Sequence, residues 1–153
     1  MINEKYTFKQ MTPDRLFETL TLVRDVFMEF EAPDYSLEGI NEFLRFLEPL
    51  EFMEMIENDI ITVWICEYEG KIAGMIAGRN DHISLMFVDG KHHKKGIAGN
   101  LICFLKDYYK PVKLTVNSSP YAVEAYKKLG FNVIGNEQTE KGIRFIPMEW
   151  VDE

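Results

Sequence analysis

Residues 83–100 read ISLMFVDGKHHKKGIAGN, and this stretch decides the fold. Its first part belongs to a run at 82–88 with apolar residues on both faces, which is typical of a central strand in a sheet. Its last part begins a helix, because Ile97, Leu101 and Leu105 recur at helical spacing. The basic loop between them therefore joins a buried strand to the N-terminus of a helix.

The junction between this strand and this helix is predicted to bind an anion. Small residues stand at Gly96, Ala98 and Gly99, so a phosphate can approach the amide N–H groups that a helix leaves free in its first turn. The segment 91–95, KHHKK, adds positive charge beside them. Neither GxxxxGK(S/T) nor GxGxxG is present, which disfavours ATP and NAD as ligands. We therefore expect a pyrophosphate held mainly by the backbone.

Hydrophobic spacing and turn residues predict the other elements. Helices are expected at 13–31, 36–48, 97–109 and 119–129. Strands are expected at 60–66, 72–77, 82–88, 112–116, 132–135 and 143–150. We expect Pro49 to end the second helix and the polar residues 136–142 to form a loop.

This order of elements predicts an α/β fold on a mixed, mostly antiparallel sheet with flanking helices. The turn signal Glu69-Gly70 joins two of the strands as a hairpin. The strands at 82–88 and 112–116 flank a helix, so they are expected to lie parallel, joined by a right-handed crossover.

Composition limits the class of protein. The 153 residues, with 46% hydrophobic residues, fit a single domain over 1–153. A net charge of −8 disfavours nucleic acid as a partner, because a phosphate-backbone binder needs a basic face. No apolar run approaches the ~20 residues of a membrane helix, and no secretory signal is recognisable, which favours a cytoplasmic location. Cys66 and Cys103 lack metal-site spacing, so we interpret both as buried thiols and expect no metal.

Two motifs, in the expected order, resemble the GNAT superfamily of N-acetyltransferases. The first is the strand at 85–88 followed by His93-Lys94-Lys95-Gly96-Ile97-Ala98, which is similar to the family loop (Q/R)xxGx(G/A). The second is Asn117 followed by 122–131, AVEAYKKLGF, which is similar to the family's closing pattern of Asn, Ala, Tyr and Leu-Gly-Phe. One position departs from the pattern, since His93 stands where the family usually has Gln or Arg.

The resemblance implies a donor substrate and a set of contacts. The two parallel strands would splay apart, and the pantetheine of acetyl-CoA would lie between them. Backbone groups of Phe87 and Val88 would bind it, and an amide N–H there would polarise the thioester carbonyl. Tyr126 stands at the family's general-acid position. The residues expected to bind acetyl-CoA are Phe87, Val88, His93, Lys94, Lys95, Gly96, Ile97, Ala98, Gly99, Asn100 and Asn117.

The function predicted from this resemblance is direct transfer of an acetyl group from acetyl-CoA to an amine, in a ternary complex and without a metal. The acceptor, a small molecule or a peptide, is left open. Four acidic residues near the junction of the first two helices favour a cationic acceptor: Glu29, Glu31, Asp34 and Glu38. A catalytically silent acyl-CoA-binding or regulatory module is the second hypothesis, and a plain nucleotide-binding domain is the third.

The general base is not identified by sequence. A protonated amine must lose a proton before it attacks, and Glu31, Asp34, His82, Ser84 and water relays are all alternatives for accepting it. Edge strands near the C-terminus are compatible with a homodimer.

Overall fold

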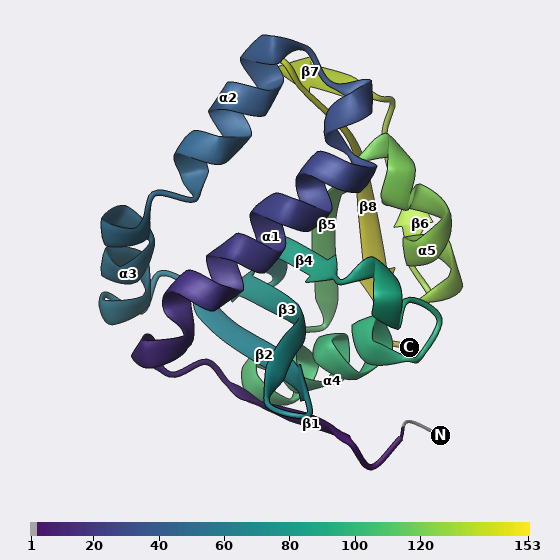
Figure 1. The fold of residues 1–153 in the computed structure, drawn as a ribbon. Coiled ribbons are helices and arrows are strands. Elements are labelled where there is room, and N and C mark those ends of the chain that lie inside the picture. The colour runs from purple at the N-terminus through teal and green to yellow at the C-terminus, as the bar shows by residue number, and fades with distance from the viewer. Residues whose placement is uncertain (1–2) are drawn as a thin grey trace.

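The structure, a computed structural model, describes residues 3–153. Within this range eight strands form a sheet in the order β1-β2-β3-β4-β5-β8-β6, with β7 paired to β8 (Figure 1). The strands are β1 Tyr6–Gln10, β2 Thr62–Tyr68, β3 Lys71–Arg79, β4 His82–Val88, β5 Lys113–Ser118, β6 Asn132–Val133, β7 Gln138–Glu140 and β8 Ile143–Val151. The α-helices are α1 Leu16–Phe30, α2 Leu37–Phe46, α3 Pro49–Glu57, α4 Ile97–Tyr109 and α5 Val123–Lys128. Short 3-10 helices are η1 Pro13–Arg15, η2 Ala32–Asp34, η3 Gly90–His92 and η4 Pro120–Ala122.

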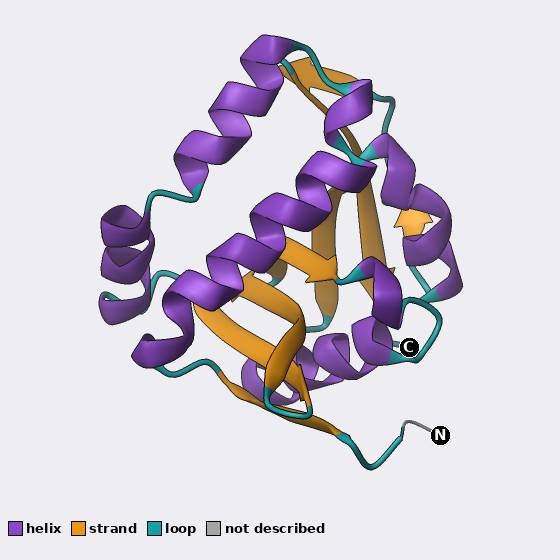
Figure 2. Cartoon of the chain, in the orientation of Figure 1, coloured by secondary structure: helices purple, strands orange, loops and turns teal. Residues whose placement is uncertain are grey.

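Helices cover both faces of the sheet (Figure 2). On one face α1, α2 and α3 cover a core that includes the fully buried Phe27 and Phe52. On the other face α4 and α5 cover a core that includes Leu101 and Leu105, also fully buried. Two apolar layers therefore hold the central strands in place from both sides. None of the helices within 3–153 is long and apolar enough to cross a membrane.

A β-bulge at Ser84 separates β4 from β5. Successive residues of β3 pair with Ile83 and Leu85, so Ser84 is an extra residue on β4. Ile83 accordingly joins the core under α4, whereas Leu85 joins the core under α1. Parallel pairing with β5 involves only His82 and Ile83. Beyond the bulge the strands diverge, which confirms the predicted mixed sheet with a splayed parallel pair.

Three elements differ from the sequence prediction. Pro49 was expected to end a helix, but it begins α3, where proline suits the first position because its missing N–H needs no partner. The Glu48 carboxylate caps α3 by accepting from the amides of Leu50 and Glu51. The strand β1 was not predicted, and β7 lies in the segment that was expected to be a loop.

The two cysteines lie in different environments. Cys66 on β2 is fully buried, as predicted. Cys103 is exposed, which corrects the expectation that both thiols are buried. Its neighbours Leu101, Ile102 and Leu105 occupy the side of α4 that packs on the sheet, so Cys103 falls on the opposite side.

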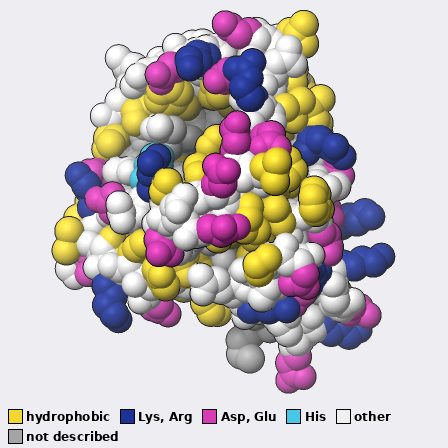
Figure 3. Space-filling view, turned by 90° about the vertical axis from the view of Figure 1, so that its left-hand side faces the viewer, with side chains coloured by type: hydrophobic (Ala, Val, Ile, Leu, Met, Phe, Trp, Pro, Cys, Tyr) yellow, Lys and Arg dark blue, Asp and Glu magenta, His cyan; other side chains and the backbone are white. Residues whose placement is uncertain are grey.

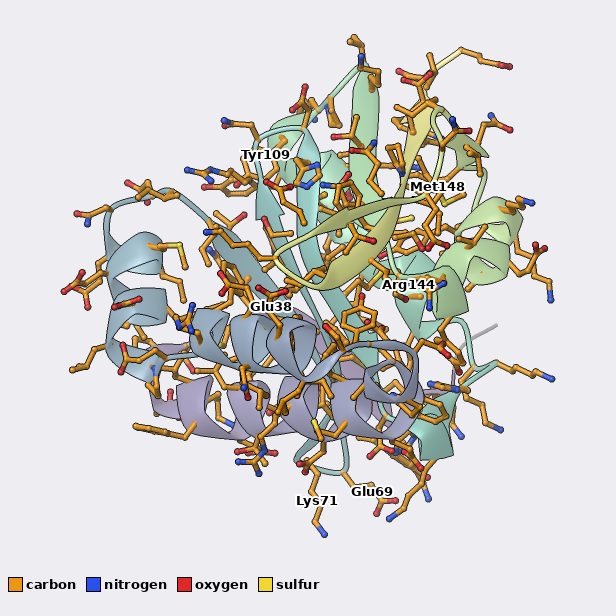
Figure 4. The ribbon with its side chains drawn as sticks, turned by 90° about the horizontal axis from the view of Figure 1, so that it is seen from above. Glu38, Glu69, Lys71, Tyr109, Arg144 and Met148 are labelled. Carbon is orange, nitrogen blue, oxygen red and sulfur yellow. The ribbon has the colours of Figure 1, made fainter. Side chains whose placement is uncertain are left out.

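The hairpin of β7 and β8 contacts the first turn of α2. An ideal Cβ on Gly39 would lie 2.1 Å from the carbonyl oxygen of Gly142, so the two backbones touch directly. Beside this contact the Tyr35 hydroxyl donates to the Arg144 carbonyl at 3.0 Å, and the Arg144 guanidinium donates to the Asp34 carbonyl at 3.0 Å. Figure 4 labels Arg144 on β8 and Glu38 on α2. We call this set of contacts, made by Tyr35, Gly39, Gly142 and Arg144, the α2 clasp.

Gly39→Ala is expected to lower the free energy of unfolding by ~1–3 kcal/mol, because the new methyl group overpacks the clasp. This loss opposes the ordinary gain of up to ~1 kcal/mol for Gly→Ala in a helix. Urea denaturation measures both effects. Gly99→Ala is the matched control, since Gly99 is also the third residue of its helix and its Cβ would lie 3.5 Å from Leu129. Equal stability changes in the two variants would contradict a tight clasp.

Candidate active site

The divergence of β4 and β5 opens a cavity of about 390 Å³. Both strands, the connection between α1 and α2, α2 itself, the start of α5 and the β7–β8 hairpin line it. Figure 3 shows a hollow on the side of the molecule that carries α2, with hydrophobic side chains around it and charged side chains at its rim. Tyr35 and Arg144 line the cavity, so the α2 clasp forms part of its wall.

Beyond the bulge, β4 presents backbone groups to the gap at alternate residues. The Asp89 N–H donates to a β3 carbonyl at 2.9 Å, and the Phe87 carbonyl lies beside a β3 glycine. Because successive residues of a strand turn their N–H and C=O toward opposite neighbours, Met86 and Val88 turn theirs away from β3. The geometry therefore favours Met86 and Val88, rather than Phe87, as backbone partners for a ligand in the gap.

His93 folds back onto the end of β4. Its Nε2 donates to the Val88 carbonyl at 2.9 Å, and its ring centroid lies 5.1 Å from that of Phe30. The side chain is therefore engaged inside the protein, where it orders the loop. The His93 hydrogen bond uses one lone pair of the Val88 carbonyl oxygen. The Val88 N–H is not involved and still faces the gap.

The loop leads into a helix N-terminus without a side-chain cap. Lys94 and Gly96 have positive φ angles of 62° and 85°, and no side chain caps α4. The amides of residues 97–99 precede the first intrahelical bond, which the Asn100 N–H donates to the Gly96 carbonyl. These free amides, reinforced by the helix dipole, suit a phosphate group.

Lysine side chains surround this helix N-terminus. Lys94 and Lys95 are exposed and line a second hollow together with Lys91, Tyr6 and Tyr68. They bring positive charge to the mouth of the loop in a chain that is acidic as a whole. The predicted anion site therefore has both local amides and a basic surrounding.

Tyr126 on α5 lines the cavity. Its side chain is only 5% exposed, and its ring packs edge-on against Phe131 at 5.4 Å. Burial raises the pKa of Tyr126 above its ordinary value, and the nearby Glu31 carboxylate raises it further. The hydroxyl therefore stays protonated and can donate a hydrogen bond. Asn117, exposed on β5, lines the same cavity.

Glu31 lies half-buried in the cavity, at the C-terminal end of α1. Burial raises its pKa to about 7, and a hydrogen bond from the Ser119 hydroxyl partly opposes this rise. The Ser119 oxygen accepts from the Ala122 N–H at 3.2 Å, which leaves the hydroxyl proton for Glu31. None of the ion pairs within 3–153 includes Glu31.

The other candidate bases are placed less favourably. His82 lies at the closed end of the gap, where its Nδ1 is 2.8 Å from the Thr115 hydroxyl, and burial lowers its pKa. Ser84 also lines the cavity, whereas Asp34 is exposed outside it. Among the residues that the structure describes, no group of three or more His, Cys, Asp and Glu side chains is arranged to hold a metal ion.

A family model described as an acetyltransferase (GNAT) domain matches residues 31–151. The chain belongs to the GNAT acetyltransferase family. It is therefore an acyl-CoA-dependent N-acyltransferase, as the two sequence motifs predicted. A search of curated proteins gave no match.

Solved structures agree with this GNAT assignment in fold. A GCN5-related N-acetyltransferase from Rhodopseudomonas palustris has a TM-score of 0.81 at 18% identity, covering 99% of this chain and 98% of its own. The PaiA N-acetyltransferase of Thermoplasma acidophilum, solved with coenzyme A, has a TM-score of 0.75 at 19% identity and coverages of 95% and 98%. The spermidine N-acetyltransferase of Vibrio cholerae, solved with CoA and spermine, has a TM-score of 0.66 at 18% identity and coverages of 98% and 97%.

The GNAT fold brings most of the predicted site residues to one edge of β4. Phe87, Asn117 and Tyr126 line the cavity, and the loop 93–100 lies directly beyond Val88. Sequence reasoning missed Ser119, Tyr35 and Arg144 as cavity residues. No local motif marks them, because they meet only when the β7–β8 hairpin reaches the connection between α1 and α2.

Ala98→Asp is expected to abolish stabilisation by acetyl-CoA, because its carboxylate occupies the free amides and repels phosphate. The unliganded protein should keep its stability or gain up to ~1 kcal/mol, since an acid in the first turn suits the helix dipole. In the wild type, acetyl-CoA at a hundredfold excess over its Kd should stabilise the fold by ~2.7 kcal/mol. Thermal melts with and without acetyl-CoA measure the difference.

Ala98→Asn is the control for this variant, because it adds similar bulk without charge and should keep most of the shift. Gly96 is a poorer position for the test, since its φ of 85° strains any added side chain. If acetyl-CoA stabilised the Ala98→Asp variant as much as the wild type, the pyrophosphate would have to bind elsewhere.

Proposed function

We propose that this GNAT protein transfers the acetyl group of acetyl-CoA directly to an amine within a ternary complex. The observation that carries the proposal is the splay of β4 from β5, which leaves the backbone of Met86 unpaired at a cavity that Met86, Tyr126 and Glu31 line. A gap with free strand groups on one side and protonatable side chains on the other suits an extended thioester and its reaction partner.

The donor follows from the geometry of the loop and the strand. The pyrophosphate lies on the amides of residues 97–99, with Lys94 and Lys95 nearby. The pantetheine runs along β4 in the manner of an added strand and meets the backbone of Val88 and Met86. Asn117 faces the donor from β5. The thioester then reaches the inner part of the cavity, where the Tyr126 hydroxyl can donate to the sulfur.

Each step of the reaction balances in atoms and charge. The neutral amine nitrogen attacks the thioester carbonyl carbon, and a β4 amide N–H stabilises the oxygen as negative charge develops on it. The C–S bond then breaks, the nitrogen loses one proton, and the sulfur leaves as a thiolate that gains one proton. Because the pKa of Tyr126 is raised, its hydroxyl donates a hydrogen bond to the developing thiolate rather than completing the proton transfer.

The charges in the cavity support an amine acceptor. The Lys141 Nζ lies 3.9 Å from the Glu42 Oε1, and the Arg144 Nε lies 2.9 Å from the Glu137 Oε2. Both cations therefore have acidic partners. Glu31 has no such partner among the described residues and remains available to a cation. The Vibrio cholerae neighbour, whose structure holds spermine, is a spermidine acetyltransferase and gives a chemically matched first acceptor to test.

A panel of amines with acetyl-CoA tests the function. Release of free CoA thiol that depends on the amine, together with mass-spectrometric detection of the N-acetylated product, is the expected result. Binding of acetyl-CoA without turnover across spermidine, aminoglycosides, amino acids and peptide N-termini would instead support a silent acyl-CoA-binding module. Protection against melting by ATP or NAD but not by CoA would point to a nucleotide-binding domain.

Tyr126→Phe is expected to lower kcat by roughly 10²-fold, because the leaving thiolate loses its hydrogen-bond donor. The Kd for CoA should change little, since the buried ring and its packing remain. Steady-state kinetics under conditions where chemistry limits turnover, with CoA binding measured calorimetrically, separate the two effects. A near-normal kcat in the variant would reduce Tyr126 to a packing role.

The second-order rate constant kcat/KM for a cationic amine is expected to fall as salt is raised, because the acidic rim attracts the acceptor at long range. Of the four acidic residues on which the expected cationic acceptor was based, only Glu31 lines the cavity, where Glu42 and Glu140 add negative charge and Lys141 and Arg144 add positive charge. Measurements with spermidine between low and high NaCl test the steering. A best acceptor that is neutral or anionic, or a rate independent of salt, would exclude it.

A further inference from the structure

We propose that Glu31 is the general base of this enzyme: it accepts the proton of the acceptor amine within the cavity and supplies the proton that the leaving CoA thiolate takes up. The assignment rests on the proposed function, because it needs an amine and a thioester in the same cavity. It selects one residue from the four side-chain candidates that sequence left open.

The position of Glu31 supports this role. It ends α1 at the edge of the cavity, and its charge acts on Tyr126, the residue proposed to contact the sulfur. Ser119, whose oxygen caps η4, lies beside the carboxylate and lowers its pKa against the effect of burial. Glu31 therefore lines the cavity where the connection of α1 to α2 meets the start of α5.

The groups that face Glu31 supply no neutralising cation. The charge of Glu31 raises the pKa values of Tyr35, Tyr121 and Tyr126, which belong to three different segments of the chain. Two basic residues of the hairpin line the cavity: Arg144 is directed to the Asp34 carbonyl and the Glu137 carboxylate, and Lys141 is paired with the Glu42 carboxylate. A bound ammonium group would therefore be the natural partner of the ionised Glu31.

The acidity of Glu31 suits both halves of the role. Its pKa of about 7 lies closer to the ~10.4 of an ordinary amine than the usual value of 4.5 does, which makes proton transfer from the amine about 300-fold less unfavourable. Once protonated, Glu31 is a stronger acid than a thiol of pKa ~8.5, so delivery of the proton to the thiolate is downhill. Tyr126, with its raised pKa, is a weaker acid than the thiol and serves as the hydrogen-bond donor.

Glu31 also opposes the stability of the fold at the pH where the enzyme would work. Its folded pKa lies above the ordinary value, so the native state binds the proton more tightly than the unfolded state does. The contribution of Glu31 to stability is therefore most favourable below about pH 4.5 and is lost as pH rises through about 7. A half-buried carboxylate whose ionisation lowers the stability of the fold is typical of functional sites, where activity is kept at a cost in stability.

The pH dependence of kcat/KM tests the proposal, with acetyl-CoA and whichever amine of the panel is turned over, beginning with spermidine. The wild type should lose kcat/KM below about pH 7, and the acidic limb of kcat should lie at lower pH, because a bound cation favours the carboxylate. The Glu31→Gln variant should show no acidic limb, and its kcat/KM at pH 8 should be at least 10²-fold lower than that of the wild type. Ser119→Ala should move the limb to higher pH, since it removes the opposing hydrogen bond.

Two further measurements do not depend on the acceptor. Carboxyl-carbon NMR of the 13C-labelled protein should show a titration with a midpoint near 7 that Glu31→Gln removes. The melting temperature of Glu31→Gln should exceed that of the wild type at pH 8 and converge with it below about pH 4.5. Glu54→Gln, an exposed glutamate of α3 outside the cavity, is the matched control and should change neither.

The outcomes distinguish the two proposals. An active wild type whose Glu31→Gln variant keeps both its rate and its acidic limb overturns the general-base assignment and leaves the proposed function standing. A wild type that binds acetyl-CoA but acetylates none of the panel amines counts against the proposed function. An NMR midpoint near 4.5 for Glu31 overturns the assignment whether or not an acceptor has been found.

Discussion

The extra residue at Ser84 is the constraint on which the rest of the structure depends. Neighbouring strands satisfy their N–H and C=O groups by pairing, so a gap between two central strands needs a physical cause. The bulge turns β4 away from β5, while β8 holds β5 in place along its full length. The backbone of Met86 and Val88 is then left facing open space. An extended donor that pairs with it completes the sheet at the point where the protein leaves it incomplete.

The same gap between β4 and β5 explains the raised pKa values of Glu31 and Tyr126. A closed sheet would bury Glu31 and Tyr126 in an apolar core, and an unpaired carboxylate there would be strongly destabilising. A fully open surface would leave both with ordinary acidities. The cavity lies between these limits, so burial raises the pKa of Glu31 to about 7 without driving the carboxyl permanently into its neutral form. Because Tyr126 is more deeply buried, it stays a hydrogen-bond donor, and in the proposed mechanism the two groups have different roles in one proton path.

Much of the donor side could be predicted from the sequence, and much of the acceptor side could not. The strand at 82–88, the helix entry at Gly96 and the pattern around Tyr126 are local signals, because each depends on residues close together in the chain. The bulge at Ser84 is not, since it is visible only as a register shift against β3. Pro49 was misinterpreted because proline both ends helices and begins them, and only the cap by Glu48 decides between the two. The acidity of Glu31 depends on burial by distant elements, which no spacing reveals.

The acceptor side is narrow because of how its wall is built. In the proposed function the splayed strands and the amide-rich loop bind the donor, so we expect α2 and the β7–β8 hairpin to discriminate among amines. In the α2 clasp two glycine backbones touch with no side chain between them, which is the closest approach that a helix and a hairpin turn can make. The cavity of about 390 Å³ lies near the lower end of the ~300–1,000 Å³ usual for ligand sites, and it must also hold the acetyl end of the donor. Under the proposed function we therefore expect a slender primary amine to be accepted more readily than a bulky ring system, which would have to displace Tyr35 and Arg144 and break the hydrogen bonds that join α2 to the hairpin.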